Sequence, residues 1–302
     1  MSDPLSPEHL FGHVQDDDGF HLPRVLTPEG SDGHLHIPQP FLLEEPLIEV
    51  QTGNALVDST FQPLDLKITK FMVLELAVAL ILLACFIGLA RRIRGGANAK
   101  GRLWNMLEVF LLFIRDDVAR PCIGRQDADR FLPFLWTMFL FVLGCNLIGM
   151  VPWMGSPTGA LAVTGALALI TFAVVLVAGM ARLGVVGFWK AQVPHMELPL
   201  VIAIPLIPLI FVIEIFGLLI KHCVLAIRLL ANMMAGHVVL AVIVAFIGVS
   251  YTAGMAIWGG VTTASVLGAT ALSMLELFVA FLQAYVFTFL SALFIGAAVH
   301  PH

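Results

Sequence analysis

The chain has 302 residues and a net charge of −5, and only 12% of its residues are charged, against about 25% in an ordinary soluble domain. Apolar runs of 18 or more residues are too long for soluble core helices, and they lack the polar–apolar alternation of outer-membrane barrel strands. Composition therefore excludes a soluble domain or a β-barrel. It predicts an all-α polytopic membrane protein surrounded by lipid, with no nucleic-acid partner.

Residues 1–66 differ from the rest of the chain because they hold twelve carboxylates and a single basic residue, Arg24. We expect a hydrophilic N-terminal tail here, followed by a membrane domain over 67–302. The segment is too polar, and too far from the first apolar run, to be a cleavable signal peptide. Its histidines are loosely spaced, and the four cysteines form no CxxC pair, so we expect neither a metal site nor a disulfide framework.

The first predicted span covers residues 71–90, and Arg91, Arg92 and Arg94 follow it directly. A cationic cluster after a span marks the cytoplasmic side, so the N-terminus is expected outside. Residues 103–113 are too short to cross a membrane, and we expect an interfacial helix there.

Two further spans are predicted at 131–151 and 160–180, joined by a short Gly/Pro/Ser turn. Arg182 and Lys190 then return the chain to the positive side, and the C-terminus is expected in the cytoplasm. No eukaryotic targeting signal is visible, which favours a bacterial inner membrane.

The last third consists of two long apolar blocks, about 199–250 and 256–298. Fifty helical residues extend about 75 Å, whereas the hydrocarbon core is about 30 Å thick. Each block could fold as two vertical spans, or as one long helix that lies strongly tilted in the membrane. No turn signal divides either block near its middle, so we favour a tilted helical hairpin. Such tilt needs a packed partner.

The few polar residues in these blocks follow helical spacing. Glu214, Lys221 and Arg228 are seven residues apart and share one face of the first helix, with Asn232 one turn beyond Arg228. His237 is nine residues after Arg228, which places it on the opposite face and about 13 Å along the axis.

Arg228 is the most informative residue, since no Asp, Glu, Lys or Arg follows it until Glu276. A charge at the bilayer centre costs about 2.5–3.5 kcal/mol even on lenient scales, so this side chain must face protein or enclosed water. His and Glu titrate near neutral pH after modest environmental shifts. Titratable groups separated by a permanent cation suit a proton path in two halves.

At these residues the chain resembles subunit a of the F-type ATP synthase. The matching motif is Arg228-Leu229, Asn232-Met233, Ala235-Gly236 and His237, followed on the last helix by Glu276 and Gln283. Leu230-Ala231 departs from the usual Phe-Gly of the family. Segments 113–121, 130–134 and 145–152 also look like the middle region of that family, whereas the first 60 residues do not match it.

The resemblance implies a non-catalytic stator subunit that packs against a rotating c-ring and needs no cofactor. It implies that Arg228 faces the c-ring carboxylate and prevents a proton short circuit. His237, Glu276, Asn232 and Gln283 would line the half-channel open to the outside, and Glu214 would belong to the cytoplasmic one. The implied partners are the c-ring proteolipid, the peripheral-stalk subunit b and the other ATP synthase subunits.

Two other functions are compatible with a polytopic chain. An autonomous proton-coupled secondary transporter predicts pseudo-symmetric halves, but the sequence has no internal repeat. An intramembrane hydrolase could use Ser273 with a histidine, yet no nucleophile motif surrounds that serine. No GxxxxGK[ST] phosphate loop occurs, so nucleotide hydrolysis does not reside in this chain. Co-purification with a small two-helix proteolipid and soluble nucleotide-binding subunits would distinguish the stator subunit from both alternatives.

Overall fold

The computed structural model describes residues 19–21, 34–39, 68–94, 101–151, 154–192 and 200–300. Five helices in this part of the chain are long and apolar enough to cross a membrane. The prediction of an all-α polytopic membrane protein is therefore confirmed. The described residues of the N-terminal tail include two three-residue strands, β1 (Gly19–His21) and β2 (His34–His36), which pair antiparallel with Gly19 opposite His36. Most of the tail lies outside the described residues.

The first long helix, α3 (Lys70–Ile93), begins at Thr69, whose hydroxyl accepts a hydrogen bond from the backbone N–H of Met72. The shorter α4 (Arg102–Phe113) occupies the range expected for an interfacial helix. It continues into the π-helical segment η1 (Ile114–Ala119) and the one-turn α5 (Arg120–Ile123). In the wider π-helical turn, different backbone N–H groups and carbonyls pair than in an α-helix. Just before this turn, the indole of Trp136 donates a hydrogen bond of 2.9 Å to the carbonyl of Leu111.

The next pair of helices is α6 (Ala128–Gly149) and α7 (Leu161–Leu183), connected through the 3₁₀ turn η2 (Pro157–Gly159). These helices occupy the regions of the second and third expected spans, and α6 begins three residues earlier than its span. A short helix that the sequence did not indicate, α8 (Val185–Ala191), follows α7 after Gly184.

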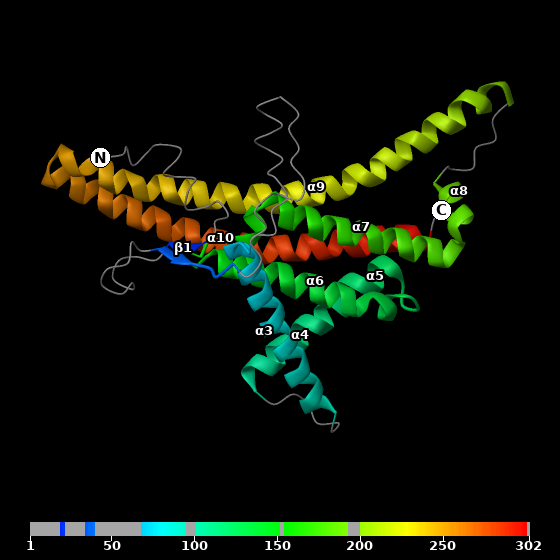
Figure 1. Ribbon diagram of the computed structural model, residues 1–302, viewed down its shortest axis with the longest axis horizontal. Coiled ribbons are helices and arrows are strands. Elements are labelled where there is room, and N and C mark those ends of the chain that lie inside the picture. Colours follow the sequence, from blue (N-terminus) through cyan, green and yellow to red (C-terminus); the bar gives the residue numbers. More distant parts are fainter. Residues whose placement is uncertain are drawn as a thin grey trace.

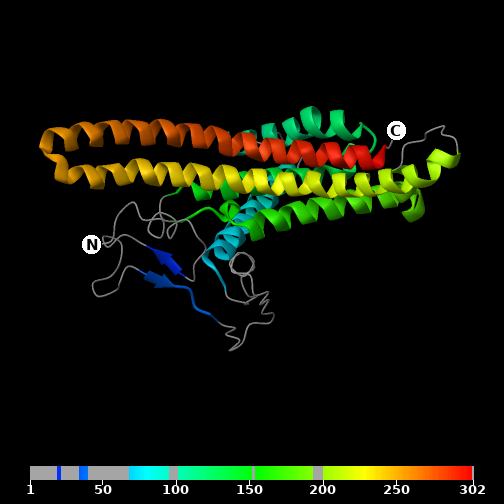
Figure 2. The same cartoon turned by 90° about the horizontal axis from the view of Figure 1, so that it is seen from above.

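Each of the two long apolar blocks forms one continuous helix, α9 (Leu200–Val249) and α10 (Met255–Val299). The 3₁₀ turn η3 (Ser250–Ala253) and Gly254 connect them. Gly254 has a φ of 101°, which residues with a side chain rarely adopt, so the reversal depends on glycine. Figures 1 and 2 show α9 and α10 running side by side along the long axis of the molecule.

The core surrounds only part of this hairpin. The buried residues of α10 begin at Glu276, apart from Ser265, and continue to Val299, where α6 and α7 cover the helix (Figure 1). Close to this end, Asp127 lies 3.3 Å from the ring of His300. The half of the hairpin near η3 extends beyond α6 and α7. Large apolar side chains of this half, among them Val244, Phe246 and Met255, are exposed.

Candidate functional site

The two helices of the hairpin bring a histidine and a carboxylate together. His237 of α9 and Glu276 of α10 approach to 3.7 Å between Nδ1 and Oε1, with side chains only 15% and 9% exposed. This separation is longer than a hydrogen bond, so the two groups are neighbours with room to adjust. A histidine and a glutamate this close can hold one proton between them or pass it through a bridging water.

Gly236 makes this approach possible. A Cβ atom placed on Gly236 would lie 2.6 Å from the Glu276 carboxylate oxygen Oε1 and 3.0 Å from its Cδ. Real Cβ atoms essentially never come so close to an oxygen, so any larger residue would displace the carboxylate. The missing side chain therefore provides the space in which Glu276 rests against the backbone of α9.

An open pocket of about 220 Å³ lies beside this contact. It is lined by residues of both helices, including Asn232, Gly236, Val239, Leu272, Glu276 and Val279. The volume admits several water molecules. The pocket therefore gives the Glu276 carboxylate and the Asn232 amide access from one side of the hairpin, while most of its wall is apolar.

Several polar atoms at the site are buried without a hydrogen-bond partner among the described residues: His237 Nε2, Glu276 Oε1 and Gln283 Nε2. Gln283 lies seven residues after Glu276 on α10 and is itself buried. Buried polar atoms are usually paired. Unused hydrogen-bonding capacity on His237 and Glu276, and on Gln283 two turns further along α10, fits a path along which protons move better than it fits a static core.

Arg228 lies on a different face of α9 from His237. Its neighbours Leu225 and Leu229 are buried, whereas Arg228 itself is exposed. Lys221 is also exposed and Glu214 is half-buried. This agrees with the helical spacing, in which these three residues share a face. The structure therefore brings His237 and Glu276 together and places Asn232 on the wall of the pocket beside Glu276, whereas Arg228, Lys221 and Glu214 follow a different face of α9 from His237.

Exposed apolar side chains lie beside Arg228 on α9 and continue along α10. Ile227 is 55% exposed, and Val224, Phe278 and Leu282 are likewise exposed along α9 and α10. A permanent cation within such a surface needs an anionic partner if the surface is placed in lipid. This face is therefore suited to a second membrane protein that carries a carboxylate.

One polar group at the site escaped the sequence reasoning. Asn146 of α6 is fully buried, and its side-chain amide donates a hydrogen bond of 3.1 Å to the carbonyl of Ala280, one turn after Glu276. Its amide oxygen accepts a bond of 2.7 Å from Thr158, which is in turn 3.0 Å from Ser156. The signal in the sequence was a lone Asn between apolar residues of a span, but its partners lie too far along the chain to be inferred.

His222 belongs to the packing of the bundle. Its ring lies between Phe172 of α7 and Phe294 of α10, at centroid distances of 5.1 and 5.0 Å, and Nδ1 is 2.8 Å from the carbonyl of Leu218. Among the described residues, no group of three His, Cys, Asp or Glu side chains could hold a metal ion.

Comparison with known proteins decides the family. A family model described as ATP synthase A chain matches residues 72–296, which is most of the chain. The chain belongs to this family.

Named relatives agree with the ATP synthase A chain assignment. The chain is 43% identical over 242 residues to the ATP synthase subunit a of Myxococcus xanthus, covering 79% of this chain and 76% of that protein. It is 38% identical to the subunit a of Chloroherpeton thalassium over 89% of this chain and 74% of that protein. The match to the subunit a of Anaeromyxobacter dehalogenans, at 38% identity, covers 80% of this chain and 60% of that protein.

Membership of the ATP synthase A chain family assigns the chain a role in the proton-translocating membrane sector of an ATP synthase complex. The chain is a multi-pass membrane component of that complex and is not catalytic by itself.

Proposed function

We propose that this chain is the proton-conducting stator subunit a of a rotary F-type ATP synthase. It forms two offset half-channels that lead to a carboxylate on the c-ring, and Arg228 separates them. His237, Glu276, Asn232 and Gln283 line the half-channel that opens to the outside. Glu214 belongs to the half-channel that opens to the cytoplasm.

The observation that carries this proposal is the meeting of His237 and Glu276 across the hairpin, on a different side of α9 from Arg228. The 3.7 Å between Nδ1 and Oε1 supports treating the two residues as one proton-binding unit. The pocket beside Glu276 supplies access to it. Arg228 lies nine residues earlier, about 13 Å along the helix axis. Arg228 therefore lies between this pair and Glu214 along α9, and in this proposal a proton needs a carrier to pass from one half-channel to the other.

The c-ring carboxylate is that carrier in this proposal. A nearby guanidinium favours the ionised form of a carboxylate, so a ring carboxylate facing Arg228 releases its proton and becomes available for the next one. The same permanent positive charge repels a proton that would pass directly between the half-channels. Arg228 thus acts through its charge, and its exposed position on α9 supports contact with a partner.

The length of the helices supports a tilted arrangement. The 50 residues of α9 extend about 75 Å, which exceeds the hydrocarbon thickness of about 30 Å more than twofold. A hairpin inclined in the membrane plane brings Glu214, Arg228 and His237 to similar depths along the path of a rotating ring. Vertical helices would carry them to very different depths.

The remaining assignments follow from charge and family. Arg91, Arg92 and Arg94 at the end of α3 support a cytoplasmic location for that end. The acidic segment 1–66 then lies outside, the membrane domain covers 67–302, and the C-terminus is cytoplasmic in a bacterial inner membrane. The c-ring proteolipid and the peripheral-stalk subunit b are the direct membrane partners.

The test is ATP-driven proton pumping in inverted membrane vesicles that contain the whole complex. The Arg228→Ala variant is expected to abolish pumping, while Lys221→Ala, which removes a neighbouring exposed cation, retains most of it. The amounts of assembled complex are compared by immunoblotting. Normal coupled pumping by Arg228→Ala would overturn the proposal.

A further inference from the structure

The end of α3 and the start of α4 form an exposed cationic surface. Arg91 and Arg92 occupy the last turn of α3, Arg94 follows it, and Arg102 begins α4. All four side chains are exposed. Among the described residues of α3 and α4, the only carboxylates are Glu75, far from this end, and Glu108. The surface is therefore strongly positive.

Trp104 joins the two helices at this surface. The guanidinium of Arg92 lies 4.8 Å from the centroid of the Trp104 ring. The same ring covers Gly88, where an added Cβ would come within 2.6 Å of the indole. Arg102 begins α4 two residues before Trp104, so it lies in the turn of α4 that contacts α3 through the indole. Tryptophan with arginine is typical of the level of lipid headgroups.

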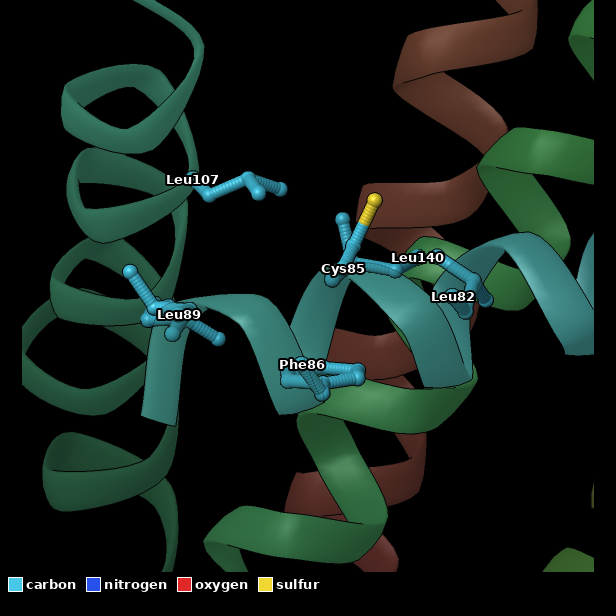
Figure 3. Close-up of a pocket in the computed structure, with 7 residues that line it drawn as sticks. Leu82, Cys85, Phe86, Leu89, Leu107 and Leu140 are labelled. Carbon is cyan, nitrogen blue, oxygen red and sulfur yellow. The ribbon is translucent and has the colours of Figure 1, made fainter. Parts of the chain in front are cut away.

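Below the arginines, α3 and α4 are separated by a wholly apolar crevice. Figure 3 shows Leu107 of α4 opposite Cys85 and Leu89 of α3, with Leu140 of α6 beside Cys85. The crevice has a volume of only about 10 Å³, about the least space that admits one water molecule, so the helices already pack closely there. The chain neighbours Leu83, Ile87, Leu103 and Met106 remain exposed beside it.

We propose that this surface binds an anionic phospholipid. The phosphate group is held by Arg91, Arg94 and Arg102, and an acyl chain lies along the exposed apolar side chains over the α3–α4 crevice. Clusters of Arg beside membrane helices attract anionic headgroups, and guanidinium groups bind phosphate oxygens in a bidentate manner. A phospholipid matches both parts of the surface, because its phosphate suits the arginines and its acyl chain suits the exposed apolar side chains. This inference does not depend on the proton path.

Arginines that only set the orientation of the chain in the membrane could lie anywhere between α3 and α4. The structure adds three features that orientation alone does not require: arginines from two helices, a tryptophan that bridges the helices, and an apolar surface directly below. A membrane helix of a partner protein could cover the same apolar side chains. It would leave several arginines without an anionic group, so the charges favour lipid.

The experiment uses the whole complex in nanodiscs made of phosphatidylcholine with a small fraction of a photoactivatable phosphatidylglycerol. After irradiation, proteolysis and mass spectrometry locate the lipid adducts. We expect adducts within residues 83–107, and a decrease of roughly tenfold in the Arg91→Gln/Arg94→Gln double variant. The conservative Arg91→Lys/Arg94→Lys variant keeps the charges and should keep at least half of the adducts. Soluble glycerol phosphate should not compete, because it lacks the acyl chain.

The matched control is Arg182→Gln/Lys190→Gln, which removes two exposed cations at the end of α7 and on α8 and should leave the adducts unchanged. Three results would overturn the proposal. Equal labelling by photoactivatable phosphatidylcholine would show a site without charge recognition. An equal loss of lipid adducts in the Arg182→Gln/Lys190→Gln control would show a general charge effect. Crosslinks from a photoreactive residue at position 103 to another protein, in place of lipid, would show that a partner helix covers the surface.

Discussion

Gly236 and Glu276 are in direct contact across the hairpin, because the space that a side chain at Gly236 would fill is occupied by the Glu276 carboxylate, with 2.6 Å between the built Cβ and Oε1. The absent side chain leaves space for the carboxylate beside the next residue of α9, His237. The approach of His237 and Glu276 thus depends on a residue that carries no polar group.

Replacing Gly236 with Ala should therefore impair proton transfer by displacing Glu276. We expect ATP-driven pumping to fall about tenfold, since displacements of about 1 Å at a reacting group cost up to 100-fold. The double variant Gly236→Ala/Glu276→Asp, with a shorter acid, should recover part of the activity.

Gly217 and Gly248 provide matched controls on the same helix, because an added Cβ at either position meets nothing within 4 Å. Both alanine variants should pump normally. An unimpaired Gly236→Ala variant would show that the carboxylate does not need this position.

The Glu276→Gln substitution tests whether the carboxyl group must exchange a proton. Glutamine preserves the shape and removes the titration, so we expect assembly to be normal and pumping to be lost by at least about 100-fold, the lower end of what one acid–base group commonly contributes. Ser273→Ala changes a half-buried residue of the same helix and should have little effect. Substantial pumping by the Glu276→Gln variant would show that Glu276 is not part of the proton path.

Asn146 should act as a structural clamp between α6 and α10. The Asn146→Leu variant loses the bonds to Ala280 and Thr158 at a fully buried position. We expect a loss of about 1–2 kcal/mol, given the modest strength of hydrogen bonds between membrane helices and the cost of the groups left unpaired. Thermal unfolding of the purified complex measures it.

The control for Asn146→Leu is Thr171→Val on α7, where the hydroxyl bonds only to the carbonyl of Leu167 in its own helix. This variant should be close to the parent in stability. Equal effects of the two substitutions would contradict a clamp between helices.

The Asp116 carboxylate in η1 gives a pH prediction outside the spans. The hydrogen bond from Arg115 holds the pKa of Asp116 below its ordinary value, and Arg120 adds a second ion pair. A lowered pKa in the folded state contributes stability above the ordinary pKa of the acid, and this contribution is lost as pH falls through the lowered value.

The Asp116→Asn variant should therefore be slightly less thermally stable than the parent at pH 7, and the difference should disappear in acid. The effect is small because the side chains are exposed. A difference that grows as pH falls would contradict this sign.

The sequence was sufficient for features that depend on local pattern. The length of the apolar runs predicted the helices, and the absence of a turn signal favoured two single long helices, which α9 and α10 are. Seven-residue spacing placed Glu214, Lys221 and Arg228 on one face, which agrees with their exposure.

Contacts between segments that lie far apart in the sequence could not be predicted from local patterns. Spacing along one helix cannot fix the register of its neighbour, so the approach of His237 to Glu276 needed the structure. The bond between Asn146 and Ala280 joins residues 134 positions apart and has no local signature. The role of Gly236 was hidden because the important feature is the absence of side-chain atoms.

The central claim is that Arg228 separates two proton half-paths. Its most direct measurement is passive proton conductance of vesicles stripped of the soluble nucleotide-binding subunits, compared for the parent, Arg228→Ala and Arg228→Ala/Glu276→Gln. We predict that Arg228→Ala raises conductance above that of the parent, because the barrier is gone. Adding Glu276→Gln should remove the increase, because the path from one side is then interrupted. Unchanged conductance in Arg228→Ala, or an increase that survives Glu276→Gln, would contradict the account.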